Sequence, residues 1–163
     1  MNSRIREHVY VACPSAQAKH HVAQFFRTHA KDDVVRLTLR VPLRERDGIA
    51  LEREVVATIS PAKAGPTIEN LHVRWTPTSG PFPTFDGTLR VREDERYESF
   101  VLELEGAYEP PFGLVGAAFD AVVGRRIASE TAQTLLHDIA HSVEANYRQK
   151  EQEKAVKRAA NVP

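Results

Sequence analysis

The chain has 163 residues, and its 22 Lys and Arg residues balance 22 Asp and Glu residues. This length predicts one domain at residues 1–150, followed by a polar tail at 151–163 that we expect to be frayed or disordered. A net charge of zero provides no field that attracts nucleic acid, and 42% hydrophobic residues are enough for a core. We therefore expect a globular protein with no nucleic-acid partner.

Cysteine content and hydropathy narrow the expected compartment. Cys13 is the only cysteine, so an intramolecular disulfide is excluded and a cysteine-based zinc site has too few thiolates. Residues 1–17 lack the continuous apolar stretch of a secretory signal, and no run approaches the ~20 apolar residues of a membrane helix. These features predict a cytoplasmic protein without an integral membrane segment.

The first elements are a strand and a short helix. Residues 4–13 alternate, with Val9, Val11 and Cys13 on one side, which predicts a strand. Ser15 then suits the N-cap of an amphipathic helix of about three turns that ends before Lys31.

Five period-two runs fill the middle of the chain, at residues 35–43, 49–59, 71–76, 85–92 and 100–109. Each run places its apolar residues on one face, and Asp47-Gly48 between the first two suits a tight hairpin. The connections are short and rich in turn residues, which favours sequential antiparallel pairing. With the first strand, the sequence predicts a six-stranded antiparallel meander.

The last element is a long helix, expected from residue 112 to about 150. Leu135, Ile139 and Val143 fall in one apolar stripe when each residue advances by ~100°. An α+β fold, in which a curved antiparallel sheet grips this helix, buries the apolar faces of both.

This element order resembles the helix-grip superfamily known as START-like or SRPBCC. The segment between Trp75 and Asp120 resembles the uncharacterised bacterial members of this superfamily in sequence. Two motifs are similar: Phe82-Pro83-Thr84-Phe85-Asp86-Gly87-Thr88-Leu89 and Leu104-Glu105-Gly106-Ala107-Tyr108-Glu109-Pro110-Pro111-Phe112-Gly113. The resemblance implies a deep cavity between the sheet and the terminal helix that holds an apolar or amphipathic small molecule. It supplies no universal catalytic residue and no cofactor.

Arg53 is the most informative polar residue. It shares the phase of Leu51 and Val55, so a regular strand points its guanidinium toward the core, where an isolated charge is costly. The residue then pairs with an inward acid, for which Glu7 is the candidate, or meets an anionic ligand. A bulge or an edge position that turns it outward is the competing interpretation.

Further candidate ligand-binding residues are apolar or aromatic and occupy inward positions. Tyr108 follows Leu104 in phase, so its hydroxyl needs a partner inside the protein, which is a ligand or, more commonly, a backbone group. The complete candidate set is Arg53, Trp75, Phe85, Leu104, Tyr108 and Phe119.

No residue is predicted to be catalytic or to bind metal. His137 and His141 share one helical face, but both lie about 160° from the core direction of Ile139 and should face solvent. Cys13 is expected to be a small buried hydrophobe. Glu103, Glu105 and the strand arginines should pair across the outer sheet face.

The leading functional hypothesis is binding or carrying of a small hydrophobic or amphipathic molecule of the lipid, polyketide or quinone type. One alternative is a metal-free enzyme of the polyketide cyclase or dehydratase kind, in which Arg53 and Tyr108 polarise a carbonyl. Another is a protein-protein interaction module without a ligand. The sequence is compatible with a monomer and with a homodimer.

Overall fold

The structure is a computed structural model, and it describes residues 3–44, 50–61, 70–80, 82–110 and 121–161. The expected hairpin at Asp47-Gly48 and the segment 111–120, which includes Phe119, lie outside the described residues.

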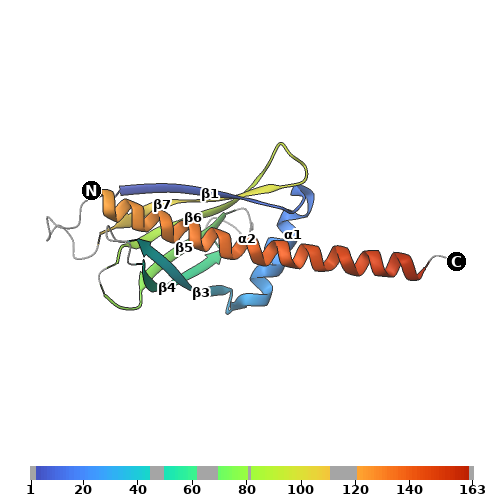
Figure 1. The fold of residues 1–163 in the computed structure, drawn as a ribbon, viewed down its shortest axis with the longest axis horizontal. Coiled ribbons are helices and arrows are strands. Elements are labelled where there is room, and N and C mark those ends of the chain that lie inside the picture. Colours follow the sequence, from blue (N-terminus) through green and yellow to red (C-terminus); the bar gives the residue numbers. More distant parts are fainter. Residues whose placement is uncertain (1–2, 45–49, 62–69, 81, 111–120, 162–163) are drawn as a thin grey trace.

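Within the described residues, seven strands form one antiparallel sheet, in the order β1-β7-β6-β5-β4-β3-β2 (Figure 1). The strands are β1 (Ser3–Val11), β2 (Ala30–Lys31), β3 (Val34–Arg44), β4 (Ala50–Pro61), β5 (Asn70–Pro77), β6 (Thr84–Glu93) and β7 (Phe100–Glu109). The predicted antiparallel sheet is confirmed, and β2 is the one strand that the prediction missed. A strand of two residues is too short to show an alternating pattern.

The turn between β2 and β3 is built from two acidic residues. Asp32 and Asp33 both have positive φ, at 55° and 61°. Left-handed backbone at both central positions is typical of the tight hairpin turns that match strand twist, and aspartate tolerates it better than most residues.

Helix α1 (Ser15–His29) follows β1 and buries Ala18, His21, Val22 and Phe25. The N-cap is Pro14, so the expectation that Ser15 caps the helix was wrong. Ser15 is the first helical residue instead, and its hydroxyl donates to the carbonyl of Ser99 at 2.5 Å while its amide donates to the carbonyl of Tyr97 at 3.2 Å. These bonds hold the start of α1 against the β6–β7 hairpin. Because Tyr97 and Ser99 are far from Ser15 in the sequence, the residues around Ser15 could not predict this contact.

Helix α2 (Ala121–Ala160) crosses the concave face of the sheet (Figure 1). It contacts β1 and β3, which lie near opposite ends of the strand order, as well as β7 between them. One helix reaches both sides only because the sheet curls around it. The expected stripe is buried, with Leu135, Ile139 and Val143 at most 1% exposed, so the predicted α+β helix-grip fold is confirmed.

The C-terminal end of α2 differs from the expected frayed tail. The helix continues through the expected boundary at residue 150 and ends at Ala160, beyond the body of the protein (Figure 1). Residues 151–160 are mostly polar and exposed, as their composition indicated. Good helix formers and local pairs, such as Lys154 with Glu151 at 2.7 Å, favour continued helix over fraying.

Candidate functional site

Four of the predicted ligand-binding residues form the floor of the concave face beneath α2. Trp75, Leu104, Tyr108 and Phe85 lie on the adjacent strands β5, β6 and β7 and are at most 2% exposed. In the sheet register, Phe85 is opposite both Trp75 and Tyr108. The fold therefore brings these residues together, and in this structure they pack against one another and the core.

The Trp75 and Phe85 rings are stacked, with centroids 4.0 Å apart. The indole nitrogen donates to the carbonyl of Pro83 at 3.2 Å, which fixes the orientation of the ring. On its other side the Phe85 ring lies over Gly87 and Gly106, which oppose each other in the register. A Cβ added to either glycine would come 2.5 Å from Cζ of Phe85, so two glycines are needed for the ring to lie flat on the sheet.

Arg53 is half-buried and shares the concave face with Val55 and Ala57. Its Nη1 atom lies 3.7 Å from the position that a Cβ on Gly80 would occupy. Glu7 also faces inward, but its carboxylate accepts a hydrogen bond of 2.6 Å from the Gln133 amide on α2. Both residues belong to the described part of the chain, and no ion pair joins them there, so the proposed Arg53–Glu7 pair is not formed.

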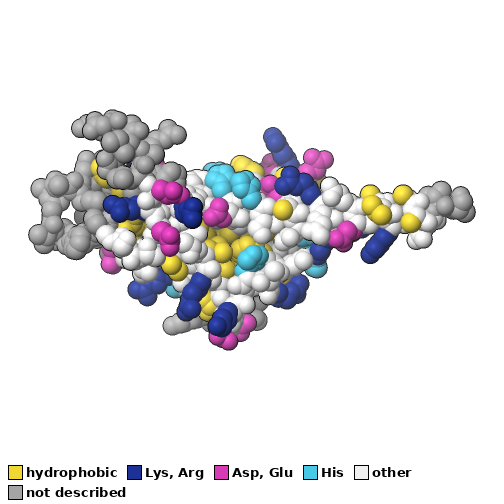
Figure 2. Space-filling model, turned by 60° about the horizontal axis from the view of Figure 1, so that its bottom comes forward, with side chains coloured by type: hydrophobic (Ala, Val, Ile, Leu, Met, Phe, Trp, Pro, Cys, Tyr) yellow, Lys and Arg dark blue, Asp and Glu magenta, His cyan; other side chains and the backbone are white. Residues whose placement is uncertain are grey.

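A groove of about 600 Å³ runs between β3 and α2. We call it the α2–β3 groove, and it is lined by one residue of the strand and one side of the helix, namely Arg40, Arg126, Ser129, Glu130, Gln133, Thr134, His137 and Asp138. Its walls are mostly apolar despite these residue types, because the side-chain stems contribute much of the surface. Figure 2 shows hydrophobic side chains between α2 and the basic side chains below it.

Four of the eight residues lining the α2–β3 groove form hydrogen bonds within the protein, namely Arg126, Glu130, Gln133 and Thr134. Arg126 Nε donates to Glu130 at 3.0 Å, and the Thr134 hydroxyl donates to the Glu130 carbonyl at 2.9 Å. Partial burial raises the pKa of Asp138, and the neighbouring His141 and His137 partly counteract this effect. The groove therefore combines an apolar wall with a few fixed polar groups, as ligand sites do.

His137 and His141 on α2 and Cys13 after β1 are the residues considered from the sequence for metal binding and nucleophilic chemistry. His137 and His141 are exposed on α2, with ring centroids 6.1 Å apart, and no group of three metal-ligating side chains occurs among the described residues. Cys13 is fully buried, and burial, reinforced by Glu144, raises the pKa of its thiol to about 11. A thiol with that pKa is almost entirely protonated at neutral pH and is a poor nucleophile.

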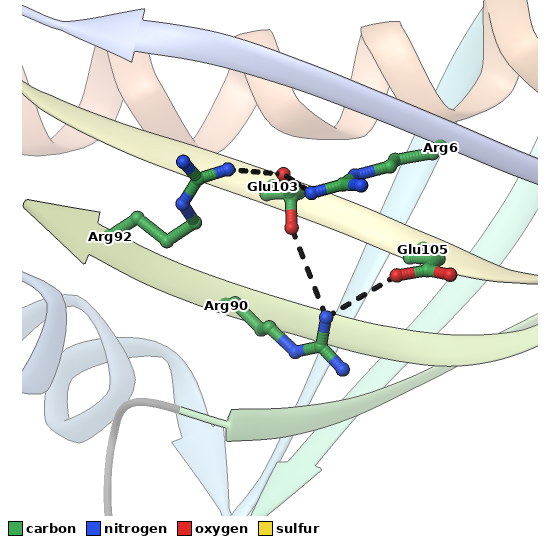
Figure 3. A network of polar contacts seen from close by, with 5 residues as sticks. All are labelled: Arg6, Arg90, Arg92, Glu103 and Glu105. Carbon is green, nitrogen blue, oxygen red and sulfur yellow. Dashed lines mark hydrogen bonds and ion pairs between the residues drawn. The ribbon is translucent and has the colours of Figure 1, made fainter. Parts of the chain in front are cut away.

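The convex face carries the predicted cross-strand ion pairs. Glu103 on β7 is only 4% exposed, and its Oε2 atom accepts hydrogen bonds from Arg6 on β1 at 2.8 Å and Arg92 on β6 at 2.7 Å. Arg90 lies 3.9 Å from Glu103 and 3.3 Å from Glu105 (Figure 3). Burial opposes ionisation of Glu103, but the bonds from Arg6 and Arg92 outweigh it and lower its pKa. The cluster ties three strands together.

Sequence reasoning missed the buried histidine His21 between α1 and α2. Its ring is 1% exposed and packs edge-on against Tyr147, with centroids 5.6 Å apart. Nε2 lies 3.3 Å from the Gln17 side-chain oxygen, whereas Nδ1 is buried without a partner among the described residues. The position of His21 in the apolar phase of α1, one residue before Val22, was the available signal.

The α2–β3 groove was also missed. The alternation of the strand predicted Arg40 on its polar face. In the structure the Arg40 side chain lies beside α2, which is far away in the sequence. The alternating pattern contains no signal for this contact. Such a juxtaposition is a property of the packed fold.

Comparisons with known proteins identify the fold. No family model matches the chain, and no curated protein matches it in sequence. The crystal structure of the Zhui aromatase/cyclase from Streptomyces sp. R1128 is similar, with a TM-score of 0.51 and 12% identity over 88% of this chain and 94% of that one. A START superfamily protein from Mycobacterium smegmatis has a TM-score of 0.47 and 13% identity over 91% and 99% of the respective chains.

The topology and the first of these similarities define a START-like, or SRPBCC, helix-grip fold. At 12% identity the likeness concerns the fold alone. Neither α1 nor α2 is apolar enough over a sufficient length to cross a membrane.

Proposed function

We propose that this protein binds a small hydrophobic or amphipathic molecule, of the lipid, polyketide or quinone type, between the concave face of the sheet and α2. The α2–β3 groove is the observation that carries the proposal, because its volume of about 600 Å³ falls within the ~300–1,000 Å³ typical of small-molecule sites. The groove lies at the junction of β3 and α2, outside the packed core residues of the concave face.

In this proposal Trp75, Phe85, Leu104 and Tyr108 form the inner wall of the ligand site. Their close packing means that a ligand reaching them must separate α2 from the sheet or part the stacked rings. The Arg53 guanidinium lies close to Gly80 and supplies a polar group at that end of the proposed site. Phe119, in the segment before α2, completes the proposed set.

Native mass spectrometry of the purified protein, followed by solvent extraction and identification of bound molecules, tests the proposal. We expect one small molecule per chain. Ser129→Trp fills the α2–β3 groove and should abolish the adduct, whereas Ala145→Trp, at an exposed position of α2 outside the groove, should retain it. Protein that carries no adduct and takes up none from a lipid extract would contradict the proposal.

An aromatase/cyclase-type activity is a second candidate, favoured by the similar fold of the Zhui aromatase/cyclase. The residues proposed to polarise a substrate carbonyl are Arg53 and Tyr108. The activity predicts that a linear poly-β-ketone analogue is converted to a cyclic product, and that Arg53→Gln and Tyr108→Phe each slow conversion without preventing ligand binding. Binding without conversion would leave only the carrier function.

A further inference from the structure

Among the residues that the structure describes, Arg40 is the Lys or Arg side chain of the α2–β3 groove that forms no ion pair. Its groove neighbour Arg126 is bonded to Glu130, and Gln133 is bonded to Glu7. Arg40 is exposed, and the described residues offer it no ion pair. The groove thus holds a guanidinium with its donors available.

The direction of the Arg40 side chain strengthens this point. Glu54 on β4 lies directly opposite Arg40 in the register, which is the usual geometry for a cross-strand ion pair. No such pair forms between these two described residues, and Arg40 instead lines the groove with α2. Beyond Val35, no described strand pairs with the outer edge of β3, so this edge leaves room for the side chain to turn toward the helix.

The surroundings of Arg40 are suited to an amphipathic molecule, which has one polar end and one apolar end. The groove walls are mostly apolar, and apolar side chains are visible beside the basic ones on this face (Figure 2). Asp138 also lines the groove, and no ion pair joins it to Arg40 among the described residues.

We propose that the α2–β3 groove selects an amphipathic carboxylate, whose acidic group binds the Arg40 guanidinium while its apolar part lies along α2 toward the sheet. This inference rests on the proposed function and specifies the ligand class. A planar guanidinium presents paired N–H donors that match the two oxygens of a carboxylate, and a neutral alcohol of equal length lacks that match.

Isothermal titration with dodecanoate and dodecan-1-ol, both below their aggregation concentrations, tests this selection. We expect the wild-type protein to bind dodecanoate about ten-fold more tightly, as one charge-assisted contact of about 1.4 kcal/mol would give. Arg40→Gln should remove this preference by weakening dodecanoate binding and leaving dodecan-1-ol binding unchanged. Arg36→Gln, four residues earlier on the same face of β3 and outside the groove, is the matched control and should keep the preference.

The outcomes separate the two proposals. Equal affinities for the two probes in the wild-type protein would overturn the selection of a carboxylate while supporting an apolar ligand site. Equal losses in Arg40→Gln and Arg36→Gln would show a general charge effect and would also overturn it. Failure of both probes to bind would contradict the carboxylate site and the proposed function together. Because both arginines are exposed, circular dichroism melts should confirm that each variant folds.

Discussion

The indole of Trp75 lies nearly parallel to the phenyl ring of Phe85, with an interplanar angle of 11° and centroids 4.0 Å apart. Both rings belong to the core, and Trp75 is the only tryptophan in the chain. Its fluorescence therefore reports on this one place, at the proposed inner wall of the ligand site.

Removing the Phe85 ring should open a cavity under Trp75. We expect Phe85→Ala to lower the free energy of unfolding by about 3–5 kcal/mol, the usual range when a large buried aromatic side chain is replaced by alanine. The emission of Trp75 should shift to longer wavelength as water approaches it. Urea denaturation followed by fluorescence measures both effects, and Tyr97→Ala, at a position 87% exposed, should change stability by less than ~0.5 kcal/mol. Equal stability of the two variants would contradict the packing described for Phe85.

A side chain at Gly87 should be incompatible with the flat Phe85 ring. A Cβ there would come 2.5 Å from the backbone oxygen of Glu105 and 2.5 Å from Cζ of Phe85. Gly87→Ala should therefore destabilise the protein by about 1–3 kcal/mol, as overpacking does. Adding Phe85→Leu should not restore stability, because the clash with the β7 backbone persists and the stacking of Phe85 on Trp75 is lost. Thermal melts of the single and double variants measure this, and an unchanged melting temperature in Gly87→Ala would disprove the contact.

Glu103 should contribute more to stability than its neighbour Glu105. Glu103→Gln removes the charge that accepts bonds from Arg6 and Arg92, and we expect a loss of about 1–2 kcal/mol, reduced from the value for a buried pair because both arginines are largely exposed. Glu105→Gln, which loses one longer ion pair at 3.3 Å, is the control with a smaller expected loss. Denaturant titration at neutral pH measures both losses, and an equal loss of unfolding free energy in Glu105→Gln and Glu103→Gln would refute this ranking.

The pH dependence of the Glu103 effect has a definite sign. The pKa of Glu103 is lowered in the folded state. Its contribution to folding stability is therefore fully present above the ordinary carboxyl pKa of about 4.3, and it is lost as pH falls through the lowered pKa. The stability difference between wild type and Glu103→Gln should accordingly shrink in acid. A difference that stayed constant down to the lowest pH at which the protein folds would argue against an ionised Glu103.

His21 should make the contact between α1 and α2 sensitive to acid. Burial lowers its pKa, and Lys150, His20 and Lys154 add to the effect while Glu151 opposes it. Protonation also places a charged N–H at Nδ1, where no acceptor is present among the described residues. The neutral form stabilises the fold above the ordinary histidine pKa of about 6.5, and this stability is lost as pH falls from there toward the lowered pKa.

Stability measured between pH 7.5 and 5 tests the role of His21. The wild-type free energy of unfolding should fall with pH, and His21→Leu should flatten that dependence, whereas His8→Gln, on the exposed face of β1, should retain it. The same slope in wild type and His21→Leu would assign the acid sensitivity to other groups.

The fold could be predicted from the sequence because its main signals are local and periodic. Alternation located β3 to β7 within a few residues, and the stripe through Leu135 and Ile139 identified the face of α2 that meets the sheet. The end of α2 was misplaced because a polar, exposed helix has no apolar stripe beyond Tyr147. The short strand β2 left no pattern at all.

The candidate site was less accessible to sequence reasoning. Period and residue type correctly placed Trp75, Phe85, Leu104 and Tyr108 on the concave face, but they cannot distinguish a packed floor from a cavity wall. The candidate ion pair between Arg53 and Glu7 is not formed, and Glu7 instead accepts a hydrogen bond from Gln133, a residue far along the chain that the strand pattern cannot place. The groove at Arg40 depends on the curl of the sheet around α2, which no local pattern records.

Native mass spectrometry of the purified protein beside Ser129→Trp tests the central claim most directly. The account predicts one small hydrophobic or amphipathic molecule bound per wild-type chain, released by organic solvent and absent from Ser129→Trp. A wild-type chain that carries no adduct, even after incubation with a lipid extract, would contradict a ligand site between the sheet and α2, as would an adduct that Ser129→Trp keeps undiminished.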